Sequence, residues 1–328
     1  MTTSVKAISL FSGMGGDSLG MMNAGCDVIA FNEFDKHAIN SHELNFPDST
    51  LICDASQKKE KDKTNIQLIP DAVFSAYKDE GELIFAGFSC QGFSNGGKKL
   101  PDDPRNSLFR DFARVTNCIR PKYIIGENVD GLLSRKTATG ENYIDVIVAE
   151  FEKIGYNITY QVCHTVRYGV PQLRKRLIIV GIRKDLDKTF VFPEPLNDGK
   201  TNLPNLLNII QFSMEGAIKI EPDDFDMTTI PSECILTDME NDDGEDTDNI
   251  HPYLRLKAKK RGEEYAGKVH HCLLSFSKRD SPIHCEIIDI RKPSKTIICS
   301  YDHQPRLFVP LRNKNGYYIR CILPDELK

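Results

Sequence analysis

A single cysteine in a loop of small and polar residues is the strongest candidate nucleophile in the sequence. Cys90 lies in the segment AGFSCQGFS, residues 86–94, directly after a short apolar run. The thiolate is the reactive form of cysteine, and an accessible loop with polar neighbours favours it, whereas a cysteine packed among apolar side chains is inert. Because free cysteines are among the most buried residues, Cys90 indicates covalent chemistry only if other groups join it.

Three charged side chains could assist such a thiolate. Glu127 follows the apolar run 123–126 and precedes Asn128, so its carboxyl group would emerge beside the cysteine loop. An ion-paired structural glutamate is the alternative. Arg174 and Arg176 lie two residues apart in the segment QLRKR, and both side chains can leave one face of a strand because side chains alternate along it. Contact with substrate or phosphate competes there with an ordinary solvent-facing strand.

A glycine-rich turn near the N-terminus is a candidate cofactor site. Phe11, Gly13 and Gly15 belong to the segment FSGMGG, which follows a strand-like run and precedes a helical one. Glycines let the backbone approach a ligand closely, and a helix N-terminus presents free N–H groups. Glu33, 20 residues after Gly13, could accept hydrogen bonds from ribose hydroxyls, and Asp54 could accept one from an adenine amino group. These residues do not separate a dinucleotide from S-adenosylmethionine.

Apolar β-branched runs alternate with helical stretches as far as about residue 185, which is typical of a parallel sheet with crossover helices. We expect strands at residues 6–11, 27–32, 49–53, 83–86, 123–126, 158–162 and 177–182, and helices at residues 107–119 and 144–154. The predicted fold class is therefore α/β, with a doubly wound, mostly parallel sheet. In such sheets ligands bind beyond the carboxyl ends of the strands, where the glycine turn, the Cys90 loop and Glu127 all fall.

The composition predicts a globular, intracellular protein. The 328 residues are 40% apolar and 27% charged, without a membrane-length apolar stretch or a signal-peptide pattern. We expect no membrane association, and a location in the cytoplasm or nucleoid of a prokaryote or the nucleus of a eukaryote. The ten cysteines include no CxxC pair, so no metal site is expected. The net charge of −5 includes seven acids between Asp238 and Asp248 and becomes +2 without them, so it does not decide the partner.

Five motifs occur in a fixed order: FSGMGG, the CQGFS loop, ENV, QLRKR and RKPSKT at residues 291–296. In this combination the chain resembles the DNA (cytosine-5)-methyltransferases over about residues 1–185 and 287–327. The resemblance implies the S-adenosylmethionine-dependent methyltransferase fold with a smaller inserted domain. Residues 1–186 would be the catalytic and cofactor-binding domain, residues 187–288 the target-recognition domain, and residues 289–328 a segment returning to the catalytic domain, incomplete at its C-terminus.

The same resemblance implies the site residues. Those expected to hold S-adenosylmethionine are Phe11, Gly13, Gly15, Glu33 and Asp54. Cys90 would attack C6 of a cytosine in double-stranded DNA, because C5 accepts a methyl group only after a thiolate adds at C6. Glu127 would bond the N3 and exocyclic amine of the base, and Arg174 and Arg176 would lie near it. The base must leave the duplex to be reached.

Two departures from the family pattern bear on activity. Ser89 stands where the family usually has proline, which frees the backbone before Cys90. The family's Gln-Gly-Phe-Pro and Gly-Asn motifs are not found before Lys328. A second polypeptide could supply them, or activity could be lost.

Two other functions stay open: a nucleic-acid-binding relative that is weak or inactive in catalysis, and a tRNA cytosine-5 methyltransferase, whose Pro-Pro-Cys-Gln and Cys-Phe-Thr segments are not found. Basic residues at 255–261 are candidates for phosphate contact; a solvated surface is the alternative. Among them are Lys257, Lys259, Lys260 and Arg261. The target DNA sequence and a biological role such as restriction–modification do not follow from the sequence.

Overall fold

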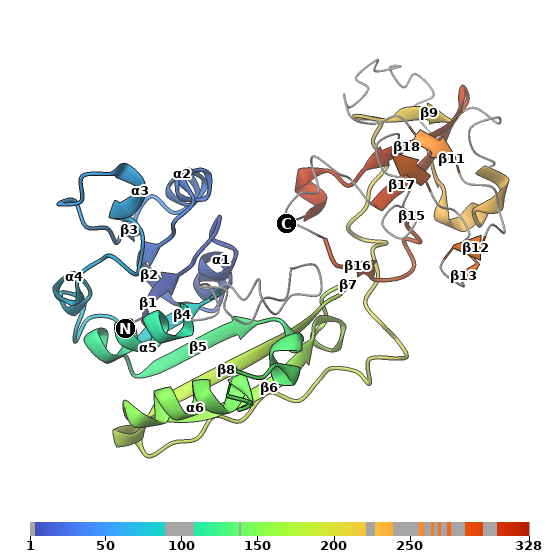
Figure 1. Ribbon diagram of the computed structural model, residues 1–328. Helices are drawn as coiled ribbons and strands as arrows, with labels where there is room; N and C mark the ends of the chain where they lie inside the picture. Colours follow the sequence, from blue (N-terminus) through green and yellow to red (C-terminus); the bar gives the residue numbers. More distant parts are fainter. Residues whose placement is uncertain are drawn as a thin grey trace. The chain divides into compact units, whose positions relative to one another are not determined.

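The chain divides into two compact units (Figure 1). The first comprises Met1–Cys163 and Lys175–Glu194, and the second comprises His164–Arg174 and Pro195–Lys328. The division by role into residues 1–186, 187–288 and 289–328 stays a prediction. This computed structural model describes residues 4–88, 108–137, 139–220, 227–238, 256–258, 264–265, 268–269, 274–276, 286–297 and 307–327.

A seven-stranded sheet forms the centre of the first unit, in the order β3-β2-β1-β4-β5-β8-β6. β1 pairs in parallel with β2 and β4, and β4 pairs in parallel with β5, so the chain winds outward from β1 in two directions. β8 pairs antiparallel to β5. The predicted α/β class with a doubly wound, mostly parallel sheet is confirmed. The strands are β1 Lys6–Leu10, β2 Asp27–Asn32, β3 Thr50–Leu51, β4 Leu83–Ala86, β5 Tyr123–Asn128, β6 Tyr156–His164 and β8 Lys175–Arg183.

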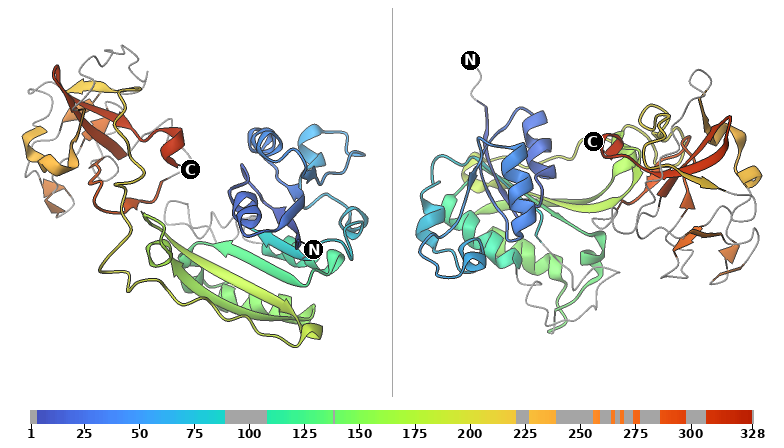
Figure 2. Two further views of the ribbon diagram at one scale, coloured as in Figure 1. Left: turned by 180° about the vertical axis from the view of Figure 1, so that it is seen from behind. Right: turned by 90° about the horizontal axis from the view of Figure 1, so that it is seen from above.

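Helices pack on both faces of this sheet (Figures 1 and 2). The helices of the first unit are α1 Gly16–Asn23, α2 Lys36–Asn45, α3 Glu60–Lys63, α4 Asp71–Ser75, α5 Leu108–Ile119 and α6 Tyr143–Lys153. Met21 of α1 packs with Ala7 and Leu83 on one face of the sheet. α5 and α6 cover the other face, which the next side chains along β1, Ile8 and Leu10, occupy.

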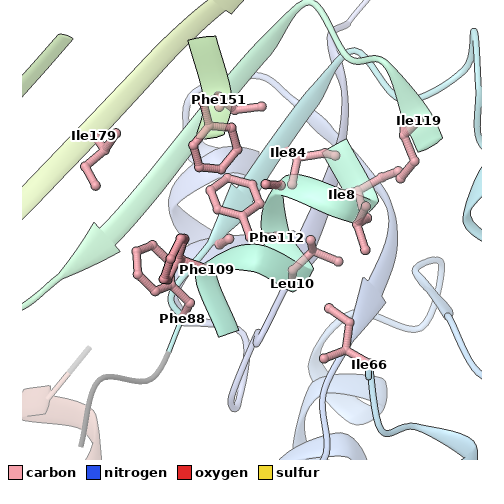
Figure 3. Packing of buried hydrophobic residues seen from close by; sticks show 14 of the residues in the cluster. Ile8, Leu10, Ile66, Ile84, Phe88, Phe109, Phe112, Ile119, Phe151 and Ile179 are labelled. Atoms are coloured by element: carbon pink, nitrogen blue, oxygen red, sulfur yellow. The ribbon is translucent and has the colours of Figure 1, made fainter. Parts of the chain in front are cut away.

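The main core lies between the sheet and α5 and α6 (Figure 3). Buried α5 residues recur at helical spacing, including Phe109, Phe112 and Ile119, and so form one apolar stripe. The ring of Phe112 meets that of Phe151 from α6 edge-on, with 4.8 Å between centroids. Each such buried side chain contributes about 1.5–3 kcal/mol relative to exposure. This core holds the carboxyl ends of β1, β4 and β5 in register.

Most predicted elements agree with the structure to within two residues at each end, as for the helix predicted at residues 144–154 and found at Tyr143–Lys153. The strand predicted at residues 49–53 is found as the two-residue β3, which pairs with β2 only at Thr50 and Leu51. The prediction of one strand carrying both arginines is wrong: β8 begins at Lys175, and Arg174 lies just before it. Local alternation does not reveal that the ladder to β5 starts only after Arg176.

A second, smaller sheet forms the core of the second unit, in the order β10-β17-β18-β9, with β15 also paired to β17. β17 is buried over nearly its whole length, including Phe308, Val309 and Leu311. Its side chains therefore do not alternate between buried and exposed. The strands of this unit are β7 Gln172–Leu173, β9 Ile218–Ile220, β10 Leu236–Thr237, β11 Leu256–Ala258, β12 Glu264–Tyr265, β13 Lys268–Val269, β14 Leu274–Phe276, β15 Glu286–Ile287, β16 Ser294–Lys295, β17 Leu307–Asn313 and β18 Gly316–Cys321. The short 3₁₀ helices of the chain are η2 Asp130–Ser134, η3 Thr165–Tyr168, η4 Lys184–Leu186, η5 Met227–Thr229, η6 Ser232–Cys234 and η8 Pro324–Leu327.

Two sequence motifs that are far apart in the chain pair within the second unit. β7, from the QLRKR segment, lies parallel to β16, from the RKPSKT segment. The Ser294 amide donates to the Pro171 carbonyl at 2.8 Å, and the Thr296 hydroxyl donates to the Leu173 carbonyl at 2.8 Å. The two motifs therefore form one structural element.

A buried ion pair holds the last turn of the described chain. Arg320 is 1% exposed, and its two Nη atoms lie 2.7 and 2.8 Å from the carboxylate oxygens of Glu326 in η8. Arg320 also donates to the Ser213 and Gln211 carbonyls. Burial acts to raise the pKa of Glu326, but hydrogen bonds from Arg320 and from backbone N–H groups outweigh it and lower the pKa. The geometry is bidentate, with the remaining donors satisfied.

Replacing Glu326 by alanine should destabilise the second unit by about 3–5 kcal/mol, because it leaves the Arg320 guanidinium buried without its partner. Urea unfolding followed by circular dichroism measures the change. The exposed Glu215→Ala is the matched control and should shift stability by less than about 0.5 kcal/mol. Equal effects of the two substitutions would contradict a stabilising role for the pair.

Candidate functional site

The glycine turn joins β1 to α1 through a left-handed backbone. Phe11, Gly13 and Gly15 have positive φ values of 56°, 54° and 94°, which glycine adopts freely and phenylalanine rarely. A Cβ on Gly15 would lie 2.2 Å from the Phe46 ring and 2.9 Å from the His42 ring, whereas a Cβ on Gly13 would meet nothing within 4 Å. The turn thus packs tightly against α2 at Gly15 and leaves space at Gly13.

Glu33 lies directly against this turn. The Gly13 amide donates to Glu33 Oε2 at 2.8 Å, and the amides of Phe34 and Asp35 donate to Glu33 Oε1 at 2.7 and 2.8 Å. Asn32, which is buried, donates to the Ile52 carbonyl at 2.9 Å and so ties the end of β2 to the end of β3. The structure therefore brings Glu33 to the predicted turn, while its contact with ribose stays a prediction.

Asp54 follows β3 and is buried, with 8% exposure. Its carboxylate accepts from the Ser56 hydroxyl at 2.7 Å, from the Ser56 amide at 3.0 Å and from the Gln57 side chain at 2.9 Å. The hydrogen bonds from Ser56, followed by that from Gln57, lower the pKa of Asp54. Three protein donors already hold this carboxylate, so an adenine amino group would have to share it. Its role as an adenine acceptor stays a prediction.

Two residues beside the turn were not selected from the sequence. Phe34 follows Glu33 and is 56% exposed, so its ring is a candidate to stack on a base; an aromatic residue directly after the acid was the available signal. Asp17 lies in the first turn of α1 and accepts a hydrogen bond from the Ser9 hydroxyl of β1. A charged residue within an otherwise small and apolar stretch was the only signal for Asp17.

The start of the Cys90 loop is held by the neighbouring strand. Phe88 is buried, and its carbonyl accepts a hydrogen bond from the Asn128 side chain at 3.1 Å. A Cβ on Gly126 of β5 would lie 3.3 Å from the Phe88 ring, so glycine permits this close packing. Cys90 itself, with Ser89, lies outside the described residues. What the structure places is the entry to the loop, beside the end of β5.

Glu127 and Arg176 form an ion pair between β5 and β8. Arg176 Nε lies 2.5 Å from Glu127 Oε1, with side-chain exposures of 22% and 27%. The pair forms because β8 runs antiparallel to β5, so the first residues of β8 lie opposite the last residues of β5. Both groups stay accessible enough to contact a ligand. Arg174 is also partly exposed, but it precedes β8 and is grouped with the second unit.

The sequence profile described as C-5 cytosine-specific DNA methylase matches residues 5–272 of this chain. The chain belongs to this family. Members of the family use S-adenosylmethionine as methyl donor. A Cβ at Gly13 would meet nothing within 4 Å, so the backbone beside the Glu33 carboxylate is open to a ligand.

Similar proteins are type II methyltransferases of bacteria. The chain is 37% identical over 194 residues to M.NgoFVII of Neisseria gonorrhoeae, covering 59% of this chain and 48% of that protein. It is 35% identical over 205 residues to M.XorII of Xanthomonas oryzae pv. oryzae, covering 62% and 46%. The chain thus spans about half the length of these relatives. A solved structure of a mutant DNMT2 of Spodoptera frugiperda is 21% identical, with 65% and 61% coverage and a TM-score of 0.47.

The predictions about membrane association, metal binding and phosphate contact can be compared only with the described residues. Among the described residues, no helix has the length and apolar character to cross a bilayer. Within the same ranges, no three His, Cys, Asp or Glu side chains gather as metal ligands would. Lys257 lies in β11, but its side chain is not described, and Lys259, Lys260 and Arg261 lie outside the described residues. The proposed phosphate contacts stay a prediction.

Substituting Gly15 by alanine should destabilise the chain by about 2–4 kcal/mol, since the methyl group would overlap Phe46 and also force a left-handed backbone on alanine. Thermal unfolding of the purified protein measures this. Gly20 of α1 is the matched control: a Cβ there meets nothing within 4 Å, and alanine should be neutral or stabilising by about 1 kcal/mol. A Gly15→Ala variant as stable as wild type would show that α2 does not pack on the turn as described.

Proposed function

We propose that the chain transfers a methyl group from S-adenosylmethionine to C5 of a flipped-out cytosine in double-stranded DNA, through a covalent bond between Cys90 and C6. The observation that carries the proposal is the arrangement at the end of β5. There Asn128 holds the entry to the Cys90 loop, and the adjacent Glu127 is paired with Arg176. The entry to the loop and a carboxyl group suited to the N3 edge of a pyrimidine thus come from neighbouring strands, which supports the proposal.

The protein groups have distinct roles in this chemistry. The Cys90 thiolate adds to C6, and the electron pair of the C5=C6 bond moves toward C5 and N3. Glu127 shares a proton with N3 and accepts a hydrogen bond from the exocyclic amine, which absorbs the developing negative charge. Arg176 holds the Glu127 carboxyl in one orientation. The bound cofactor supplies an electrophilic methyl group on a positively charged sulfur.

Release restores the thiolate. After C5 carries the methyl group, a base removes the C5 proton, and the electrons of that bond re-form the C5=C6 double bond. The bond between C6 and the Cys90 sulfur then breaks, and the thiolate leaves with that electron pair. Extrusion of the base from the duplex costs a few kcal/mol, which contacts to Glu127 and the arginines would offset.

The Cys90 role has a direct covalent test. A DNA duplex containing 5-fluorocytosine should trap the wild-type protein, because fluorine at C5 blocks the final proton removal. Cys90→Ala should abolish both trapping and methylation detected by bisulfite sequencing. Cys118→Ala is the matched control, since burial raises the pKa of the Cys118 thiol, and it should still be trapped. Trapping that persists in Cys90→Ala, or methylation of tRNA but not of DNA, would overturn the assignment.

A second polypeptide carrying the Gln-Gly-Phe-Pro and Gly-Asn motifs is the partner we propose in addition to DNA. Support comes from the sheet face on which α1 lies. Phe85 and Ile125 are only partly buried at the edge of its small apolar cluster, and Leu19 and Met22 of α1 are each 49% exposed. Apolar surface of this kind marks partner sites, and both faces of a mostly parallel sheet are normally covered.

Mixing with such a chain should give co-purification and a gain in methylation. The double substitution Leu19→Glu with Met22→Glu should block both, because it places charges in the apolar contact. Leu44→Glu is the matched control: Leu44 is 84% exposed on α2, so assembly should survive. Turnover by the purified chain alone at about 1 per second or faster, an ordinary enzyme rate, would rule the partner out.

A further inference from the structure

A partly buried carboxyl group lies beside the glycine turn and is not used by the mechanism above. Asp17 Oδ2 accepts the hydrogen bond of the Ser9 hydroxyl, and Ser9 is fully buried. Asp17 Oδ1 is buried and has no hydrogen-bond partner among the described residues. The carboxyl thus connects the strand before the turn to the helix after it. A buried, unsatisfied carboxylate oxygen is costly unless something binds there.

The surroundings of Asp17 do not offset its charge. Burial, the largest effect, raises the pKa of Asp17 to about 6, and the nearby Glu33 carboxylate raises it further. The hydrogen bond from Ser9 and the nearby backbone N–H groups of Ser18 and Asp17 act in the opposite direction and lower the pKa. On α2, His42 bonds to Ser18, the next residue after Asp17, but burial lowers the pKa of His42 to about 4, so it is neutral when Asp17 titrates. The charged side chain that acts on the Asp17 carboxyl, that of Glu33, is therefore also acidic.

We propose that Asp17 is the counter-charge for a cationic group, sulfonium or ammonium, at the methionine end of S-adenosylmethionine. This rests on the proposed function, since it assumes that this cofactor occupies the glycine turn. Glu33 touches the turn at Gly13, while Asp17 lies at the other end of the same turn, beyond Gly15. If the ribose of the ligand contacts Glu33 and the rest of the ligand runs along the turn, the portion attached to the ribose reaches Asp17. In S-adenosylmethionine that part carries a sulfonium, an ammonium and a carboxylate group, with a net charge of about +1 at neutral pH.

The pairing couples cofactor affinity to pH. A bound cation favours the ionised carboxyl and returns its pKa toward the ordinary value of 3.8. Between that value and about 6 the free protein holds a proton that the complex releases, so affinity rises with pH through this window and is constant above it. From pH 5 to pH 7 the affinity should rise about tenfold. The reason is that pH 5 lies about one unit below the pKa of the free protein, about 6, and each unit below that pKa lowers the affinity about tenfold.

Calorimetric titration of the full chain at pH 5, 6, 7 and 8 tests this with three ligands. S-adenosylmethionine carries both cations, S-adenosylhomocysteine carries only the ammonium group, and 5′-methylthioadenosine carries neither. The tenfold rise is expected for the first and not for the third. A rise for S-adenosylhomocysteine assigns the pairing to the ammonium group, and a flat profile assigns it to the sulfonium group.

Asp17→Asn keeps the size of the side chain and should remove the rise while leaving binding of 5′-methylthioadenosine unchanged. Glu33→Gln is the contrasting variant: it should weaken all three ligands alike and keep the rise for S-adenosylmethionine. The same rise for 5′-methylthioadenosine, or its persistence in Asp17→Asn, would overturn the inference. Failure of all three ligands to bind wild type at pH 7 would instead contradict the proposed function, and the inference with it.

The unliganded protein provides an independent readout of the same carboxyl group. Because the fold raises the pKa of Asp17, the protonated form is favoured in the folded state. The contribution to stability is therefore complete below about pH 4 and declines as pH rises to about 6. The melting temperature of Asp17→Asn should exceed that of wild type above pH 6 and equal it near pH 4. An equal difference at both pH values would mean that Asp17 does not titrate in this window.

Discussion

The hydrogen bond from the Gly13 amide to the Glu33 carboxylate is the contact on which the first half of the site depends. It joins the turn after β1 to the loop after β2, and Asn32 extends the connection to the end of β3. The same turn packs against the end of α2 at Gly15, where a Cβ would overlap Phe46. Removing either contact would loosen the connection between the Glu33 carboxylate and the backbone of the turn.

The second half of the site depends on strand direction. β4 and β5 are parallel neighbours, so the segment that leads to Cys90 leaves the sheet at the same edge at which Glu127 lies. β8 runs the other way, and for that reason the first part of β8 meets the last part of β5 and Arg176 reaches Glu127. An all-parallel sheet would have placed the arginine at the opposite edge. One reversed strand therefore supplies the cation beside the Glu127 carboxyl group.

The second unit shows how distant motifs become one element. The QLRKR and RKPSKT segments pair as β7 and β16, and the buried bidentate pair of Arg320 and Glu326 holds η8 to the same unit. A buried ion pair offsets its desolvation only when its geometry and further hydrogen bonds are good. Here carbonyl acceptors at Ser213 and Gln211 complete the coordination of the guanidinium. In the sequence, this part of the fold is marked only by the RKPSKT motif.

Local pattern determined the strands, the main helices and the motif residues, because apolar periodicity and glycine placement are properties of short segments. The assignment of Cys90 rests on the sequence alone, since that residue lies outside the described ranges. The tertiary structure decided what depends on pairing and packing between segments. In it, β8 runs antiparallel to β5, and Arg174 precedes β8. Arg176 forms an ion pair with Glu127, and the Asp17 carboxyl accepts a hydrogen bond from Ser9. Pairing direction and burial arise from contacts between residues distant in the chain, so no local pattern encodes them.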